Sequence, residues 1–89
     1  MMERSEILDK VTQIIRKVVR CGDKPITPNV DLITELGADS MDMMEIAVYI
    51  EKTFHFTVDT VAEVNLRRVQ ELVDLVERHQ APKDNAASS

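Results

Sequence analysis

The helix-breaking residues of this chain are confined almost entirely to one short stretch. Both glycines and two of the three prolines lie between residues 22 and 37, and the third proline is Pro82. Because glycine and proline interrupt helices more strongly than other residues, long helices can form only on either side of this stretch. The chain has 89 residues, which is too short for a second domain. These constraints favour one small domain built from helices.

Apolar residues recur every three or four positions in three segments, as on one face of an α-helix. The first stripe consists of Ile7, Leu8, Val11, Ile14, Ile15, Val18 and Val19. We expect its helix to be opened by Ser5 and to end before Gly22. A second helix, from about Ser40 to Phe54, has a predicted buried side of Met43, Ile46, Ala47, Ile50 and Phe54. The last stripe, in a helix that ends before Pro82, contains Val69, Leu72, Val73 and Val76.

The segments between these helices differ in character. Residues 21–39 form a connection longer than the roughly 2 to 8 residues usual between bundled helices. We expect four apolar residues to hold it against the core: Ile26, Leu32, Ile33 and Leu36. Thr60 and Glu63 have the spacing of a capping box, which predicts a short helix from Thr60 to Asn65. The predicted fold is all-α: a small bundle of three main helices plus this short one.

Charge and composition exclude several classes of function. Residues 81–89 are small and polar and are expected to be a disordered tail after a domain of residues 1–80. The net charge is −5 and aromatic residues make up 3%, which argues against nucleic-acid binding. Cys21 is the single cysteine, so no internal disulfide can form, and with the distant His55 and His79 it gives no metal-ligand spacing. Without an apolar leader or membrane-length segment, we expect a cytoplasmic protein with no membrane insertion. We also expect it to be a monomer.

The most informative stretch is LGADSMDMMEI, residues 36–46. A glycine turn leads into a helix whose start carries Asp39, Ser40 and Asp42, so Ser40 is expected to lie exposed at a positive helix terminus. On these residues alone, Ser40 or Asp39 could simply be the N-cap of the helix.

This stretch resembles the prosthetic-group motif of acyl carrier proteins, Gly-Ala-Asp-Ser-Leu followed by an acidic residue, with Met41 replacing leucine. The similarity in layout extends over residues 5 to 80 without a needed gap. It implies that a phosphopantetheinyl transferase esterifies Ser40 with 4′-phosphopantetheine from coenzyme A. The arm would then carry acyl thioesters to enzymes of fatty-acid, polyketide or related synthesis. Ser40 would be an attachment point rather than a catalytic nucleophile, so we expect no enzyme activity.

A second pattern lies beside the core stripe of the same helix. Met41, Met44 and Val48 are spaced to share one face, and acidic residues surround them, namely Asp39, Asp42, Glu45 and Glu51. A generous apolar face and solubilising surface acids would explain the pattern without any partner. We favour a docking surface for partner enzymes with basic patches, because methionines adapt to different partners and charges complement one another. The resemblance likewise implies that this is the recognition helix.

Three residues depart from the pattern of primary fatty-acid carriers. Lys52 interrupts the acidic run, and Arg67 and Arg68 place two cations near the start of the last helix, where its dipole disfavours them. A carrier dedicated to a special acyl group, or ordinary sequence drift, would explain these changes equally well.

Other functions fit the sequence less well. A hydrolase with Ser40 as nucleophile would lack the Gly-x-Ser-x-Gly elbow and would need His55 or His79 as its base. A calcium site fails because Pro28 and Thr34 stand where the EF-hand needs glycine and glutamate. The stronger alternative is a non-catalytic helical adaptor without a prosthetic group, which an intact mass would distinguish. Under the carrier hypothesis, the aliphatic interior is also expected to admit the chain of an acyl cargo.

Overall fold

The computed structural model describes residues 3–58 and 66–80 and contains three helices. They are α1 (Arg4–Val18), α2 (Ser40–Phe54) and α3 (Val69–Gln80). No strand is assigned in these ranges, and Asp31 and Arg68 form one isolated antiparallel bridge. The all-α prediction is confirmed for the three main helices. The short helix predicted from Thr60 to Asn65 and the tail at 81–89 lie outside the described residues.

Helix α1 begins two residues earlier than the sequence predicts. The carbonyl of Glu3 accepts hydrogen bonds from the amides of Glu6 and Ile7, each at 3.0 Å. The Glu6 carboxylate in turn accepts from the amide of Glu3 at 3.4 Å. Glu3 therefore takes the capping position that Ser5 was expected to fill. The helix stops at Val18 because Val19 is extended, with φ −100° and ψ 127°.

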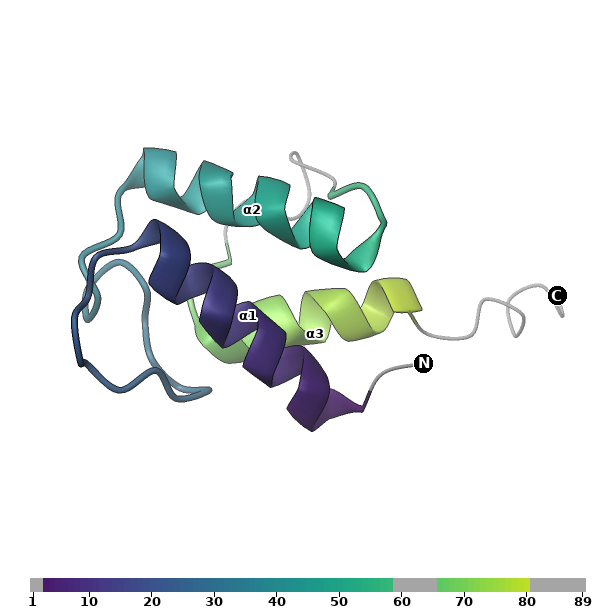
Figure 1. Cartoon of the computed structure of the whole chain (residues 1–89), viewed down its shortest axis with the longest axis horizontal. Coiled ribbons are helices and arrows are strands. Elements are labelled where there is room, and N and C mark those ends of the chain that lie inside the picture. The colour runs from purple at the N-terminus through teal and green to yellow at the C-terminus, as the bar shows by residue number, and fades with distance from the viewer. Residues whose placement is uncertain (1–2, 59–65, 81–89) are drawn as a thin grey trace, which may run out of the picture.

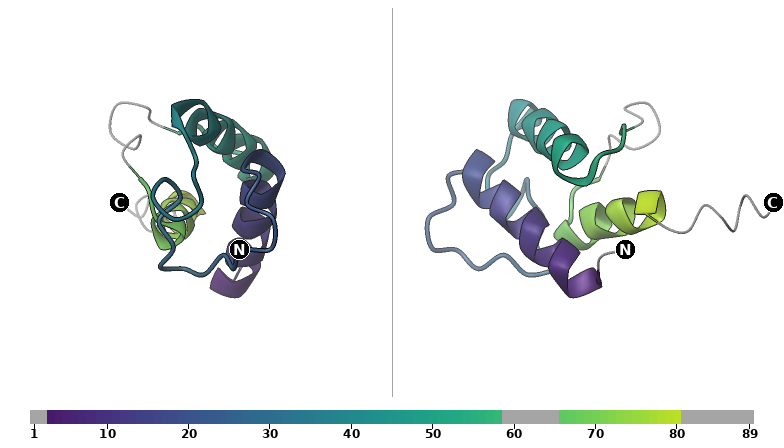
Figure 2. Two further views of the ribbon diagram at one scale, coloured as in Figure 1. Left: turned by 90° about the vertical axis from the view of Figure 1, so that its left-hand side faces the viewer. Right: turned by 45° about the vertical axis from the view of Figure 1, so that its right-hand side comes forward.

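The helices enclose an aliphatic core (Figure 2). Helix α1 packs against both other helices, whereas backbone contacts between α2 and α3 are sparse. Figure 1 shows α1 starting near the end of α3 and finishing near the start of α2. The largest side chains with almost no exposure are Ile7, Ile15, Leu32, Ile46, Ile50 and Leu75. Leu32 belongs to the long connection, which is thus part of the folded core.

The connection at residues 19–39 runs around the end of the bundle (Figures 1 and 2). Leu32 and Leu36 are buried, and Ile26 packs against the core as predicted. The prediction for Ile33 is wrong, because this residue is 39% exposed. Its neighbours Asp31 and Leu32 occupy the inward positions of the turn, so Ile33 is directed toward the surface beside α2.

Candidate functional site

Ser40 is the first residue of α2 and is exposed. The chain reaches it through a tight turn in which the amide of Gly37 donates to the Ile33 carbonyl at 3.2 Å, and the amide of Ala38 donates to the Leu32 carbonyl at 2.9 Å. The first of these bonds has the pattern of the αL motif that ends many helices, in which the amide of the left-handed residue donates to the carbonyl four residues earlier. Gly37 has φ +79°, a conformation that favours glycine. The glycine of the motif thus ends one helical turn just before α2 begins.

Asp39, rather than Ser40, caps α2. The Asp39 carboxylate accepts from the amide of Asp42 at 2.8 Å. The Asp42 carboxylate accepts from the amide of Asp39 at 3.2 Å, which completes a capping box. The sequence left either Asp39 or Ser40 as the cap, and the structure assigns Asp39. The hydroxyl of Ser40 therefore has no capping role to perform.

An apolar cavity of about 490 Å³ lies beside Ser40. This volume falls within the range of small-molecule sites in proteins. Ser40 and Asp39 are its polar lining residues, and the rest of the lining comes from the connection before α2, from α2 and the segment after it, and from α3 and the residue Leu66 before it. These lining residues are Ile33, Ala38, Met43, Met44, Ile46, Ala47, Ile50, Val58, Leu66, Leu72 and Leu75. Met43 and Ala47, predicted to be buried, are half-buried because they face this cavity.

The outer face of α2 carries three exposed apolar side chains. The exposed fractions are 71% for Met41, 64% for Met44 and 46% for Val48. Of the four acids predicted to surround them, Asp39 and Glu45 are exposed and Asp42 is half-buried. The Glu51 carboxylate instead accepts a hydrogen bond from the amide of Val58 at 2.7 Å. Glu51 therefore ties the end of α2 to the segment that follows it, a contact that sequence spacing does not reveal.

The two histidines lie far from Ser40 along the fold. His55 directly follows α2 in a left-handed conformation with φ 61°. Because α2 has 15 residues, its two ends are about 22 Å apart. His79 stacks on Phe56, with the ring centres 4.2 Å apart, and so belongs to the same distant end. Neither histidine is placed to act as a base for Ser40.

Comparison with known proteins identifies the family. A model of the phosphopantetheine attachment site matches residues 9–76. Acyl carrier protein 1, chloroplastic, of Hordeum vulgare is 36% identical over 76 residues, which are 84% of this chain and 50% of that protein. An acyl carrier protein of Cyanidioschyzon merolae is 31% identical over 78 residues, 88% of this chain and 86% of that protein. One from Coprothermobacter proteolyticus is 29% identical over 76 residues, 85% of this chain and 93% of that protein.

The chain belongs to the acyl carrier protein family. Proteins of this family are carriers rather than catalysts, and their shared domain is the attachment site of 4′-phosphopantetheine. The chain spans half the length of the barley protein and most of the other two. Within the described residues, no helix has the length and apolar character needed to cross a bilayer. The cytoplasmic location stays a prediction, since the barley protein is chloroplastic.

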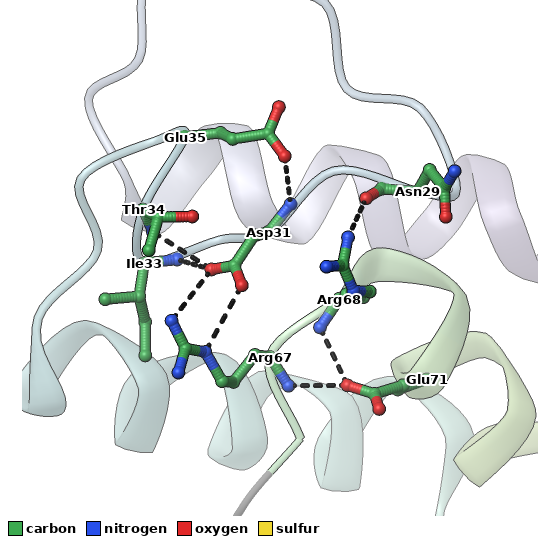
Figure 3. A network of polar contacts seen from close by, with 8 residues as sticks. All are labelled: Asn29, Asp31, Ile33, Thr34, Glu35, Arg67, Arg68 and Glu71. Atoms are coloured by element: carbon green, nitrogen blue, oxygen red, sulfur yellow. Dashed lines mark hydrogen bonds and ion pairs between the residues drawn. The ribbon is translucent and has the colours of Figure 1, made fainter.

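Sequence reasoning missed a polar network around Asp31 that supports the approach to Ser40 (Figure 3). One Asp31 carboxylate oxygen accepts from the amides of Ile33 and Thr34, each at 2.9 Å. The other lies 3.3 Å from Nε of Arg67. The hydrogen bond from Thr34, with help from Ile33 and the nearby Arg67 charge, holds the pKa of Asp31 below its ordinary value. This arrangement is an Asx-turn, in which an aspartate side chain bonds to the backbone amide two residues further on. An aspartate in a turn-forming stretch is the sequence signal for it.

Arg67 and Arg68, which depart from the family pattern, have structural roles. Their backbone amides donate to the Glu71 carboxylate at 2.8 and 2.9 Å. These two bonds lower the pKa of Glu71, and the bond from the Arg68 amide has the larger effect. The guanidinium of Arg68 donates to the Asn29 carbonyl at 2.6 Å (Figure 3). The acids Asp31 and Glu71 thus offset the two cations at the start of α3.

Proposed function

We propose that Ser40 is the residue that carries 4′-phosphopantetheine and that the loaded protein presents acyl thioesters to biosynthetic enzymes. The observation that carries this proposal is the position of Ser40. It is exposed to an approaching transferase and also lines the apolar cavity. A residue in this position can hold a flexible arm that points either outward to a partner or inward to the protein.

The surroundings of Ser40 fit the group it would carry. The first amides of α2 and the helix dipole favour the negative charge of a phosphodiester attached at this point. In the loading reaction, Ser40 Oγ would bond to the phosphorus next to pantetheine, and the bond from that phosphorus to 3′,5′-ADP would break. A separate transferase would take the hydroxyl proton. When bound, the arm supplies a terminal thiol on which an acyl group is held as a thioester.

The cavity supports a place for the acyl chain. Its walls are aliphatic or methionine side chains, and it lies beside the attachment residue. Burial of an aliphatic chain there would remove apolar surface from water, a gain of up to about 0.8 kcal/mol for each methylene. Side chains of Met43 and Met44 can adjust to the chain, because methionine has three rotatable bonds.

The outer face of α2 supports recognition by partner enzymes. Met41, Met44 and Val48 are exposed and adjoin the acids Asp39 and Glu45. We expect a phosphopantetheinyl transferase and enzymes of acyl-chain synthesis or transfer to dock here through basic patches. Fatty-acid synthesis is the usual pathway of proteins named acyl carrier proteins, and polyketide synthesis would place the same demands on this face.

The test is transfer of phosphopantetheine to the wild type and to Ser40→Ala, with coenzyme A, a phosphopantetheinyl transferase and Mg²⁺. We expect one added group on the wild type and none on Ser40→Ala, measured as intact protein mass. Since Asp39 is the cap, Ser40→Ala should keep its helical circular dichroism and most of its stability. Modification of the alanine variant, or of Ser5, would show that the group attaches elsewhere. An unmodified wild type would favour the adaptor without a prosthetic group.

A further inference from the structure

Part of the cavity lining belongs to the connection that precedes α2, and the Asp31 carboxylate helps to hold this segment in place. Ile33 and Ala38 line the cavity from residues 31–38. The amide of Ile33 donates to Asp31 Oδ1 at 2.9 Å. The position of the Ile33 side chain therefore depends on where the Asp31 carboxylate sits.

A second lining segment, just before α3, is tied to the same carboxylate and runs antiparallel beside the connection. Leu66 lines the cavity and is followed directly by Arg67. Nε of Arg67 lies 3.3 Å from Asp31 Oδ2, and its Nη2 lies 3.5 Å from Oδ1. The amide of Leu32 also donates to the Arg67 carbonyl at 2.8 Å. Two lining segments from distant parts of the sequence are thus joined by an ion pair as well as by backbone pairing, and Figure 3 shows the Asp31–Arg67 contacts together with the bond from the Ile33 amide.

The burial of this pair distinguishes it from an ordinary surface contact. The Asp31 side chain is 11% exposed and that of Arg67 is 48% exposed. In contrast, Arg4 and its partner Asp74 have side chains that are 49% and 54% exposed. Solvent screens the Asp31–Arg67 pair less, and its geometry is more strongly determined.

We propose that Asp31 and Arg67 form a clamp that steadies the paired segments carrying Ile33 and Leu66, and so helps to determine which acyl chains the cavity accepts. Both are positioning residues, since neither lines the cavity itself. This inference rests on the proposed function, because it needs an acyl group attached at Ser40. An intact clamp holds these two adjacent segments together and gives this part of the cavity a defined shape. Loss of the clamp lets the two segments shift, and discrimination between chain lengths declines.

The experiment compares thioester protection in charge-neutralised variants. Wild type and Arg67→Gln are loaded by a phosphopantetheinyl transferase with acetyl- or octanoyl-coenzyme A, and loading is confirmed by intact mass. Hydroxylamine is then added, and the loss of acyl group to the hydroxamate is followed with time. We expect the octanoyl form of the wild type to lose its acyl group more slowly than the acetyl form. In Arg67→Gln, we expect the rate of acetyl loss divided by the rate of octanoyl loss to fall about two- to fivefold. A change of this size corresponds to the free energy of one ion pair.

Arg68→Gln is the matched control, because it removes the same charge one residue away without touching Asp31. Its guanidinium contacts the Asn29 carbonyl instead, and its rate ratio should equal that of the wild type. Arg67→Lys keeps a charge that can reach Asp31 and should recover part of the ratio. If Arg67→Gln does not fold, Asp31→Asn tests the same ion pair, and its ratio should also fall. Melting of the unacylated proteins reports any purely structural effect, which would alter acetyl and octanoyl forms alike.

The possible failures are distinct. If the wild type takes up no acyl-phosphopantetheine at Ser40, the proposed function is wrong, and the clamp proposal, which depends on it, is wrong too. If loading succeeds but acetyl and octanoyl wild type react equally fast, the cavity does not shelter the chain and the clamp proposal is overturned, while Ser40 remains the attachment residue. An unchanged ratio in a folded Arg67→Gln, or an equal change in Arg68→Gln, would also overturn it.

Discussion

Helix α3 packs tightly against α1, whereas a cavity lies between α3 and α2. Toward α1, the interface is sealed by side chains such as Ile7, Ile15 and Val76, all 1% exposed or less. Arg4 spans its edge and pairs with Asp74 and Glu77. Toward α2, Leu72 and Leu75 instead line the cavity, with few backbone contacts between the helices.

This difference suggests that, within one small core, the α1–α3 side serves stability and the side beside α2 serves the binding of cargo. A protein of this size gains its stability from a limited apolar area, so a cavity between two helices is costly. The sealed side of α1 and α3 compensates for the space left beside α2. We therefore expect substitutions on the sealed side to alter folding and substitutions beside the cavity to alter the handling of cargo.

The largest expected effect is on the sealed side. Ile15→Ala should lower the free energy of unfolding by about 2–5 kcal/mol, because Ile15 is fully buried and leaves a cavity. Ile15→Val should cost only about 0.5–1.5 kcal/mol. Met44→Ala, beside the cavity and 64% exposed, should change stability by less than about 0.5 kcal/mol. Urea denaturation of the three variants measures the comparison. If Met44→Ala lowered the free energy of unfolding as much as Ile15→Ala, the division between a sealed side and a cavity side would be refuted.

The next effect concerns the cavity side and depends on cargo. Octanoyl protein should melt several degrees above the acetyl form, because each sheltered methylene contributes up to about 0.8 kcal/mol, less the cost of widening the cavity. Ala47→Leu fills part of the lining and should reduce this difference. Paired melting curves at equal pH and salt provide the measurement. Equal melting temperatures for both wild-type forms would place the chain in solvent.

A smaller effect is expected on the outer face of α2, where binding depends on charge. Glu45→Lys should slow transfer of phosphopantetheine several-fold at low salt, and the effect should shrink as salt rises. Asp42 is less suitable for this test, because its carboxylate also completes the cap of α2. Asp9→Lys makes the same change of charge on α1 and serves as the control. Equal slowing by both variants would indicate a general effect of net charge rather than docking at α2.

The smallest effect is acid sensitivity of the connection. Asp31 and Glu71 have lowered pKa values, so the unfolded chain binds more protons than the folded protein as the pH falls below about 4. Their stabilising contributions are present at neutral pH and are lost in acid. Asp31→Asn should therefore lower the urea midpoint at pH 7 and reduce the further loss between pH 7 and pH 3. If the urea midpoint of Asp31→Asn fell as much as that of the wild type between pH 7 and pH 3, the acid sensitivity would have to come from other carboxylates.

Local sequence was enough to predict the three main helices and the exposed position of Ser40 at the start of α2. The apolar spacing around Ile15, Ile46 and Val73 reflects contacts within each helix and with the core. The start of α2 at Ser40 follows from Gly37 and the Asp39–Asp42 capping box, whose interactions span at most a few residues. Such short-range features can be recognised in the sequence because both partners lie in the same local pattern.

Only the tertiary structure assigned the roles of Ile33, Glu51 and Arg67. Ile33 was predicted to be buried from its apolar character, yet it lines the cavity because Asp31 holds its backbone there. Arg67 is 36 residues from Asp31, and no local spacing records that distance. The cavity is lined by the connection, α2, α3 and Leu66 before α3, which come together only in the folded protein. Periodicity specifies which side of a helix turns inward, whereas the space left between two inward faces depends on long-range contacts.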